Sequence, residues 1–388
     1  MENFSIYKID DALGINIFYF KLVFGFLTAF FLTYIAIPKI IRVSYRKNLM
    51  DEPIKRSSHL KKVPNLGGLA IFFAISIAAS VFSYELFGRF IFLFASMVIL
   101  MFTGLMDDIL VVAPDKKLYA QIVTATLLVL GSDVRIANFF GVLGIYELNY
   151  FLSVLFTIFF FIVFINSFNL IDGIDGLAGG ITIIICLAFS YSFFALNDIQ
   201  MVVFAFTIIG SMIAFLYFNL SKKFKIFMGD TGSLLLGFLI AFMTIKLLHS
   251  VLVNKPYLPT APAIAVAMLI IPIIDTLSVT FIRIKNGHSP LKADKNHLHH
   301  KFLSVGLSHK QTSIILIASN ALVMLVTYFT KSIFNVNIMI LFVLFLGFIF
   351  TYLPYYFLKH RFLNSNEKNI SLSATYLKKR NKRGKTRP

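Results

Sequence analysis

The chain has 388 residues, of which 58% are hydrophobic and only 14% are charged, and its mean hydropathy is +0.82. A soluble globular domain carries about 25% charged residues, so the composition excludes a water-soluble protein and makes lipid the main apolar solvent. The formal net charge is +18, but the basic residues cluster between hydrophobic stretches. That distribution argues against nucleic acid as a partner and follows the positive-inside rule of membrane proteins.

Hydrophobic stretches long enough to cross a membrane recur along the whole chain. A helix needs about 20 apolar residues to span the hydrocarbon core, and eleven stretches predict an all-α polytopic membrane protein. They lie near 16–41, 67–86, 89–108, 117–135, 150–170, 177–196, 199–219, 231–249, 261–284, 311–330 and 336–358. One transmembrane catalytic domain therefore covers 16–358, after a short external segment, 1–15. The basic tail 359–388 is expected to be disordered and to rest on anionic membrane lipids.

Lys and Arg are divided unevenly between the two sets of loops. One set holds most of them, including the segments 42–62, 222–225 and 283–310 and the tail. The opposite set holds little more than Lys8, Arg89, Arg135, Lys255 and Lys331. This asymmetry predicts an external N-terminus and a cytoplasmic C-terminus. On the outer side, the glycines of segment 136–149 predict a small hairpin at the membrane surface.

Acidic residues gather at the predicted cytoplasmic ends of the helices. They are Asp107, Asp108, Asp172, Asp175, Asp230 and Asp294. An acid at such a depth is costly unless it faces a cavity, a cation or a partner, so we expect a catalytic cleft at the cytoplasmic face. Asp275, after Pro272, is the only acid well inside a span. We expect it to pair within the bundle with a Lys or Arg, or to close the mouth of the site.

Two motifs combine acids with turn-forming residues. The adjacent carboxylates of Asp107 and Asp108 repel each other unless a cation lies nearby, and Mg²⁺ prefers a few carboxylates together with phosphate oxygens and water. Asn169, Asp172 and Asp175 recur at every third residue, so on helical turns they share one face. The structural alternatives are a polar stop at the membrane boundary and ordinary Asp-Gly turns.

Three further motifs are basic or lie at a predicted helix start. The sequence Phe227-Met-Gly-Asp230-Thr opens a helix, and such a start is either a phosphate site or an ordinary N-cap. The loop after Arg283 carries His297, His299 and His300. These imidazoles suit Zn²⁺, but without a nearby cysteine we favour hydrogen bonding to a diphosphate. The fifth motif, the basic segment 56–68, on its own predicts an orientation-setting loop.

In order along the chain, from about 56 to 300, these five motifs resemble the polyprenyl-phosphate N-acetylhexosamine-1-phosphate transferase family (glycosyltransferase family 4). Three features are similar to its WecA/TagO-like branch and count against the MraY branch. They are the segment Val63–Gly68, the sequence His297-Leu-His299-His300 in place of three consecutive histidines, and an eleventh span with a cytoplasmic tail.

The resemblance implies roles for individual residues. The implied catalytic residues are Asp107, Asp108, Asp230, His297, His299 and His300. The implied substrate-binding residues are Lys62, Asn169, Asp172, Asp175, Phe227, Arg283 and Asp294. The implied metal ligands are Asp230, Asp172 and Asn169. Among these, one of the Asp107–Asp108 pair is the expected base for the lipid phosphate, and Asp175 and Phe227 are expected to hold and stack the uracil.

The resemblance also implies the reaction and its setting. It is the transfer of N-acetylglucosamine 1-phosphate from UDP-N-acetylglucosamine to undecaprenyl phosphate, with release of UMP, at the cytoplasmic face of a bacterial inner membrane. The implied cofactor is Mg²⁺, with Mn²⁺ as an alternative, and a homodimer is a family-level expectation. Direct attack and an aspartyl intermediate both remain open.

Several alternatives to this reading remain. The alternative donors are another UDP-N-acetylhexosamine (GalNAc, FucNAc or QuiNAc) and UDP-MurNAc-pentapeptide. A membrane transporter is the remote alternative, since such proteins also place acids within their spans. A CDP-alcohol phosphotransferase is disfavoured, because 176–195 lacks the Arg and Asp residues that family places after its Asp-Gly.

Overall fold

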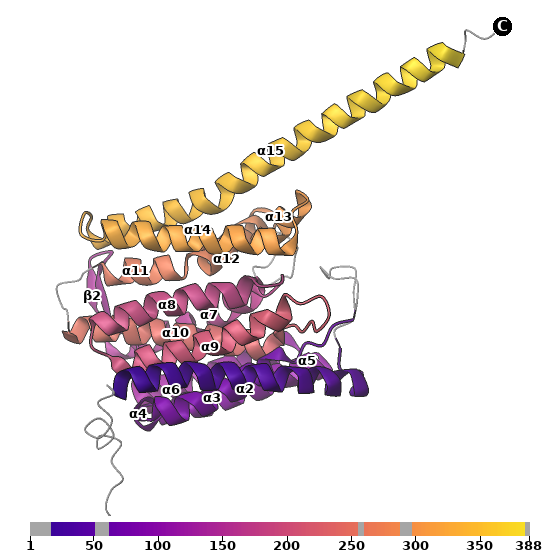
Figure 1. The fold of residues 1–388 in the computed structure, drawn as a ribbon. Coiled ribbons are helices and arrows are strands. Elements are labelled where there is room, and N and C mark those ends of the chain that lie inside the picture. The colour runs from indigo at the N-terminus through magenta and orange to yellow at the C-terminus, as the bar shows by residue number, and fades with distance from the viewer. Residues whose placement is uncertain (1–16, 51–61, 255–259, 288–296, 385–388) are drawn as a thin grey trace, which may run out of the picture.

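The computed structural model describes residues 17–50, 62–254, 260–287 and 297–384, and in them the protein is a helix bundle with one hairpin (Figure 1). Its elements are α2 (Ile17–Lys47), α3 (Gly67–Phe82), α4 (Tyr84–Arg89), α5 (Ile91–Leu110), α6 (Pro114–Ser132), β1 (Asn138–Val142), β2 (Ile145–Glu147), α7 (Tyr150–Ile171), α8 (Leu177–Ala195), α9 (Ile199–Asn219), α10 (Gly229–Asn254), α11 (Ala261–Met268), α12 (Ile270–Lys285), α13 (Leu298–Ser304), α14 (His309–Thr330) and α15 (Val336–Gly384).

The prediction of an all-α polytopic membrane protein is confirmed. In the described parts of the chain, eight helices are long and apolar enough to cross a membrane, or nine if the bent pair α11–α12 is one span. The two remaining predicted stretches are also helical, as α3 with 16 residues and α6 with 19 residues. Every predicted stretch therefore contains a helix, although α3 is shorter and α6 more polar than a standard span.

One predicted span is broken. The stretch expected at 261–284 forms α11 and α12, which are bent by 75°. The bend lies at Leu269, and Pro272 follows in the first turn of α12. Proline has no backbone N–H to donate to the preceding turn, which explains why the helix does not continue straight from α11.

Two helices form the centre of the bundle. In α9 and in α10, 78% of the residues in an apolar segment of 18 residues are buried, against 28% in α2 and in the spanning part of α15. Large apolar side chains on the outer helices remain exposed, such as Phe281 at 68% and Phe329 at 72%. Exposed side chains of this kind are expected where lipid is the surrounding solvent.

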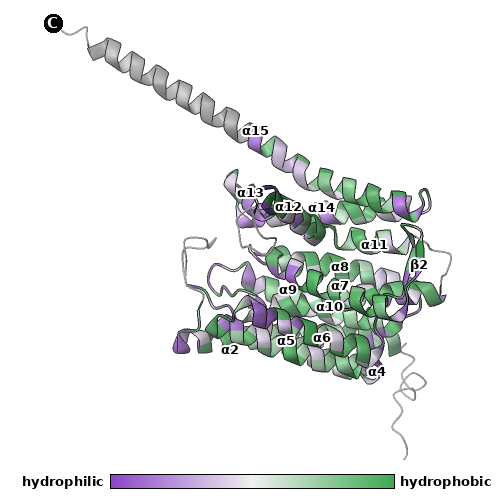
Figure 2. Cartoon of the chain, turned by 180° about the vertical axis from the view of Figure 1, so that it is seen from behind, coloured by the Kyte–Doolittle hydropathy of each residue, from purple (hydrophilic) through white to green (hydrophobic). Residues whose placement is uncertain are grey.

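The bundle has two distinct ends (Figure 1). At one end lies the hairpin β1–β2, and we call this the hairpin end. At the other, which we call the site end, α5, α7, α9 and α12 finish, α6, α8, α10 and α14 begin, and α13 lies across the surface. Figure 2 shows the apolar middle of the helices and the hydrophilic residues gathered toward their ends.

The predicted hairpin is confirmed. Strand β1 pairs antiparallel with β2, and Gly141 and Gly144 adopt the positive φ values, +84° and +79°, that the turn requires. Asn337 in α15 holds the turn from outside: its side chain accepts a hydrogen bond from the backbone N–H of Leu143 at 2.7 Å and donates one to Gly141 O at 3.2 Å.

Helix α15 has 49 residues and leaves the bundle toward the C-terminus (Figure 1). Its part Val336–His360 is long and apolar enough to cross a membrane. The helix continues to Gly384 through the basic segment that the sequence suggested would be disordered. No Pro and no Gly occurs between 361 and 383, so no residue in this segment strongly opposes a helix.

Candidate active site

Asp108 fixes the start of the central helix α10. Its Oδ1 accepts a hydrogen bond from the backbone N–H of Asp230 at 2.7 Å, and its Oδ2 accepts two from Thr231, from N at 3.0 Å and from Oγ1 at 2.6 Å. A carboxylate is favourable at this position because the N–H groups of the first helical turn have no partner within the helix. The end of α5 is thereby joined to the turn that carries Asp230.

Asp107, the other half of the acidic pair, belongs to a second cluster. Its Oδ1 accepts a hydrogen bond from the backbone N–H of Val112 at 2.6 Å. Its Oδ2 lies 2.6 Å from Lys117 Nζ, and the same ammonium lies 2.5 Å from Asp230 Oδ2. One positive charge therefore bridges two carboxylates that would otherwise repel each other.

Asn169 completes this cluster from α7. Its Nδ2 donates to Asp230 Oδ1 at 3.0 Å and to Ser233 Oγ at 2.8 Å. Asp172 follows one turn later, where the chain leaves α7. The pKa of the Asp172 carboxyl is raised well above its ordinary value, first by burial and then by the negative charges of Asp230, Asp108 and Asp175. The structure thus brings together the acids that the sequence placed on three separate helix ends.

The helices approach each other closely here because glycines lie at the crossings. A Cβ on Gly104 of α5 would lie 2.4 Å from Thr231 Cα, and one on Gly68 of α3 would lie 2.1 Å from Gly232 N. The segment before α3 also pairs with the one before α10: Phe227 N–H donates to Pro64 O, and Gly67 N–H to Phe227 O. The segment Val63–Gly68 thus holds the Phe227–Asp230 motif in place, and the exposed Lys62 immediately precedes it.

Asp175 and Phe227 both lie beside Lys225. Lys225 connects them: its Nζ lies 2.6 Å from Asp175 Oδ2 and 5.4 Å from the centroid of the Phe227 ring. His309 Nδ1 also approaches Asp175 Oδ2, at 3.3 Å. Burial alone would raise the pKa of Asp175, but His309 and Lys225 together lower it below its ordinary value. The carboxylate is therefore kept charged as a hydrogen-bond acceptor.

The histidines reach the acidic loop through α13. A Cβ on Gly173 would lie 2.4 Å from His299 Nε2, so the imidazole rests directly on the backbone beside Asp172. His299 is 3% exposed, and burial, followed by the neighbouring His300, lowers its pKa to about 3. The ring centroids of His299 and His300 are 4.3 Å apart. His299 is therefore a neutral imidazole at ordinary pH.

Three other expectations concern the loop and helix before α13. Arg283 lies in the last turn of α12, and it is buried. Asp294 lies outside the described residues. Asp275 pairs within the bundle as expected, but its partner is His297, with Oδ2 2.8 Å from Nδ1, rather than a Lys or Arg.

Asp172 and Asp230 are the residues of this cluster that could hold a metal ion. Among the described residues, no group of three or more His, Cys, Asp or Glu forms a ready metal cage. Mg²⁺ normally takes only one or two carboxylates and fills its octahedron with substrate phosphate and water, so a full protein cage is not expected. Asp172 and Asp230 supply hard oxygen donors. The pKa of Asp172 is raised by burial and, after that, by three nearby negative charges, which a bound divalent cation would offset.

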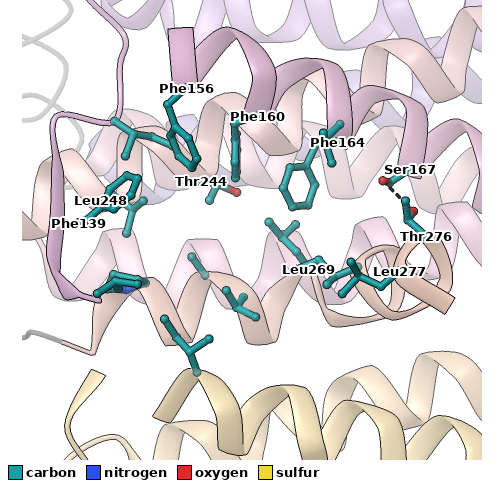
Figure 3. Close-up of a pocket in the computed structure, with 18 of the residues that line it drawn as sticks. Phe139, Phe156, Phe160, Phe164, Ser167, Thr244, Leu248, Leu269, Thr276 and Leu277 are labelled. Carbon is teal, nitrogen blue, oxygen red and sulfur yellow. Dashed lines mark hydrogen bonds between the residues drawn. The ribbon is translucent and has the colours of Figure 1, made fainter. Parts of the chain in front are cut away.

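An apolar cavity of about 300 Å³ extends from the hairpin toward this cluster. Figure 3 shows its walls: Phe156, Phe160 and Phe164 of α7 face the bent pair α11–α12, with Thr244 and Leu248 of α10 behind them. At the site end, Thr276 Oγ1 donates to Ser167 Oγ at 2.9 Å. Ser167 is two residues before Asn169 in α7, so along the helix axis the cavity ends at about the level of the polar cluster.

The sequence does not identify Lys117 as a member of the site, because it predicts only a basic residue of a cytoplasmic loop there. It predicts Lys225 as part of the positive field before the Phe227–Asp230 motif, but not its contact with Asp175. A signal was available for Lys117. Only Val111, Val112 and Ala113 separate α5 from α6, so the last turn of one helix must lie beside the first turn of the next. An acid at 107 and a lysine at 117 therefore face each other. The contact of His309 with Asp175, across more than a hundred residues, had no such signal.

Known proteins resemble the chain over most of its length. Residues 90–248 match the sequence model of a family described as glycosyl transferase family 4. An undecaprenyl-phosphate alpha-N-acetylglucosaminyl 1-phosphate transferase of Escherichia coli O157:H7 is 25% identical over 72% of this chain and 76% of its own. The protein of that name from Salmonella typhi is 26% identical, over 79% of this chain and 80% of its own.

A Bacillus subtilis protein, named as a probable undecaprenyl-phosphate N-acetylglucosaminyl 1-phosphate transferase, is 29% identical over 76% of this chain and 81% of its own. The range that matches the family model contains the whole cluster of Asp107, Lys117, Asn169 and Asp230. This central part of the chain therefore resembles glycosyl transferase family 4.

Proposed function

We propose that this chain transfers N-acetylglucosamine 1-phosphate from UDP-N-acetylglucosamine to undecaprenyl phosphate, releasing UMP. The observation that carries the proposal is the cluster of Asp107, Lys117 and Asp230 at one end of an apolar bundle, next to an apolar cavity. The cluster suits a reaction between two phosphate anions, and the cavity suits an acceptor with a long apolar chain. The names of the relatives support this transferred group and this acceptor.

The reaction forms one phosphorus–oxygen bond and breaks another. An oxygen of the lipid phosphate attacks the β-phosphorus of the donor, which carries the sugar, and the bond from that phosphorus to the oxygen of UMP breaks. Negative charge accumulates on the phosphoryl oxygens as this happens, so fixed positive groups lower the barrier. Lys117 supplies such a charge beside Asp107 and Asp230.

The two adjacent acids have different parts in this proposal. Both oxygens of the Asp108 carboxylate accept hydrogen bonds from the first turn of α10, so we assign Asp108 to the positioning of Asp230. Asp107 faces Lys117 instead. We assign it to the acceptor phosphate, which it orients or from which it accepts a proton.

Asp230 and Asp172, with the side-chain oxygen of Asn169, would hold Mg²⁺. When bound, Mg²⁺ would neutralise the diphosphate and polarise the phosphoryl group under attack. The uracil is assigned to Phe227 and Asp175, because a charged carboxylate beside an aromatic ring can accept the base N–H while the ring stacks on it. The polyprenyl chain is assigned to the cavity between α7, α10 and α11–α12.

The orientation in the membrane follows from the distribution of charge. The site end holds the basic segments of the described chain, for example Lys222, Lys223 and Lys225 before α10 and Arg283 and Lys285 at the end of α12. The positive-inside rule places this end in the cytoplasm. With each predicted stretch crossing once, the protein spans the bacterial inner membrane eleven times, and its active site opens to the cytoplasm.

The test is transfer of label from UDP-[¹⁴C]GlcNAc to undecaprenyl phosphate by the purified protein, with and without Mg²⁺. We expect Mg²⁺-dependent labelled lipid that is lost in Asp230→Asn. Asp198→Asn is the matched control, because Asp198 also forms an ion pair, with Lys246 at 3.1 Å, but at the hairpin end. Label from another UDP-N-acetylhexosamine alone would change the donor, and no product from any UDP-sugar would refute the proposal.

A further inference from the structure

A buried carboxylate outside the polar cluster holds the start of the histidine helix. Asp275 on α12 is 2% exposed. Its Oδ2 lies 2.8 Å from His297 Nδ1, and its Oδ1 accepts a hydrogen bond of 2.7 Å from the backbone N–H of Leu298. A buried charge is unfavourable unless it is paired and hydrogen-bonded, and these two contacts satisfy that requirement.

The two contacts fix two features of the site. Leu298 is the first residue of α13, so the bond to its N–H sets the point at which this helix begins. The bond to Nδ1 sets the orientation of the His297 ring. It also selects the tautomer, because a carboxylate accepts the proton on Nδ1 and leaves Nε2 as the atom available to a ligand.

The position of His297 bears on the other histidines. Its ring lies nearly parallel to that of His299, at an angle of 9° and a centroid distance of 5.8 Å. His299 in turn rests on Gly173, next to Asp172. A shift at the start of α13 would therefore also move His299 against the acidic loop.

Asp275 is itself held in place by its neighbour in the chain. Thr276 Oγ1 donates to Ser167 Oγ of α7, at 2.9 Å, and α7 ends in the turn that carries Asn169 and Asp172. The same part of α12 is thus tied to α7 through Thr276 and to α13 through Asp275. The carboxylate is a fixed point between the acidic and the histidine halves of the site.

We propose that Asp275 is a positioning residue for the transfer reaction: through His297 and Leu298 it holds the histidines of α13 in the geometry that the reaction requires. At 2% exposure it acts through His297 and does not contact substrate. The inference rests on the proposed function for its activity readout, and a second readout is independent of turnover.

The activity test is a double-mutant cycle with Asp275→Asn, His297→Ala and the double variant. Each single change is expected to lower kcat about 10- to 100-fold, the usual loss for a partner that orients a functional histidine, with KM for the UDP-sugar changed less than about threefold. The double variant should be no more than about twofold slower than His297→Ala alone, because Asp275 acts through that residue.

The matched control is Asp198→Asn, which removes a paired carboxylate at the hairpin end and should leave kcat unchanged. The melting temperature of every variant is measured beside its activity. Losses that multiply in the double variant, or a loss in Asp275→Asn no larger than in Asp198→Asn, would overturn the inference.

The second test is ¹⁵N NMR of histidine-labelled protein. The His297 signal should show a proton on Nδ1 in the wild type and should move in Asp275→Asn, while the signal of the exposed His360 should not. An unchanged His297 signal would refute the positioning role even if turnover fell. A wild type that makes no lipid product would refute the proposed function instead, and the NMR result would still decide the contact.

Discussion

Among the single side chains, Lys117 determines how the acids of the site can lie so close together. Its ammonium is 2.6 Å from Asp107 and 2.5 Å from Asp230. Without it, two partly buried carboxylates would face each other, and one of them would take up a proton. The net charge beside the substrate phosphates is therefore the sum of the charges of Lys117, Asp107 and Asp230, and not the charge of one acid alone.

Replacing Lys117 tests this balance. Lys117→Met keeps the length of the side chain but removes its charge, and we expect kcat to fall by at least about 100-fold, the typical cost of removing one charge-stabilising donor. Lys116→Met is the control, since Lys116 is adjacent in the chain but exposed. Initial rates of lipid labelling measure this effect, and equal rates for the two variants would contradict the predicted role of Lys117.

His299 makes a prediction about pH. Its pKa is about 3 in the folded protein, mainly because of burial, against 6.5 as the ordinary value. Between these pH values the unfolded chain binds one more proton at this residue than the folded protein does. The free energy of unfolding is therefore highest above about pH 6.5 and falls as the pH decreases toward 3. From pH 7.5 to 5.5 the loss is about 1.4 kcal/mol for this residue.

Thermal unfolding at the two pH values measures this loss. His299→Gln should flatten the decrease, whereas His360→Gln, at an exposed position on α15, should leave it as in the wild type. The same slope in both variants would show that His299 is not the residue responsible.

Among the helices, glycine contacts set the distance between α5 and α10. Gly104 faces Thr231 and Asp230 at the point where Asp108 bonds to the first turn of α10. Because the contact is with backbone atoms, neither side can move away by rotating a side chain. The position of Asp230 therefore depends on the spacing of two helices as well as on its own hydrogen bonds.

Gly104→Ala is expected to separate these helices. Overpacking of this kind costs about 1–3 kcal/mol of stability, and kcat should fall together with the melting temperature as the Asp108 bonds lengthen. Gly88→Ala is the control, because a Cβ at Gly88 meets nothing within 4 Å. A Gly104→Ala protein with wild-type kcat would show that the spacing has little effect on the reaction.

For the bundle as a whole, the polar cluster and the apolar cavity share the helix α7. The cavity is lined by Phe160 and Phe164, and the next two turns of α7 carry Ser167 and Asn169. One helix can therefore present the acceptor's chain and its phosphate to adjacent regions. This arrangement predicts that the cavity affects use of the acceptor and not of the donor.

Filling the cavity with Ala265→Phe tests that separation. We expect KM for undecaprenyl phosphate to rise about tenfold, equivalent to about two buried methylene groups of the chain, with KM for the UDP-sugar unchanged. Leu187→Phe, on the exposed surface of α8, should change neither constant. Equal effects on both substrates would place the acceptor elsewhere.

Local features of the sequence predicted much of the fold and the identity of the acids. Hydrophobic length located a helix in every predicted stretch, and the glycines of 136–149 predicted the hairpin. The break at Leu269 and the contacts of Lys117, Lys225 and His309 depend on which helices become neighbours, and no short pattern encodes that. Asp275 shows the difference: a buried acid must have a partner, but only the packing of α12 against α13 identifies it as His297.

The burial of Cys186 has a practical consequence. It is the only cysteine of the chain and is completely buried in α8, so its thiol is shielded from reagents in the folded protein. Single cysteines introduced elsewhere can then be labelled without first mutating the native one. An exposed hairpin position such as Leu143 and one at the site end such as Ser304 would report, through a membrane-impermeant maleimide applied to intact cells, which end of the bundle faces outward.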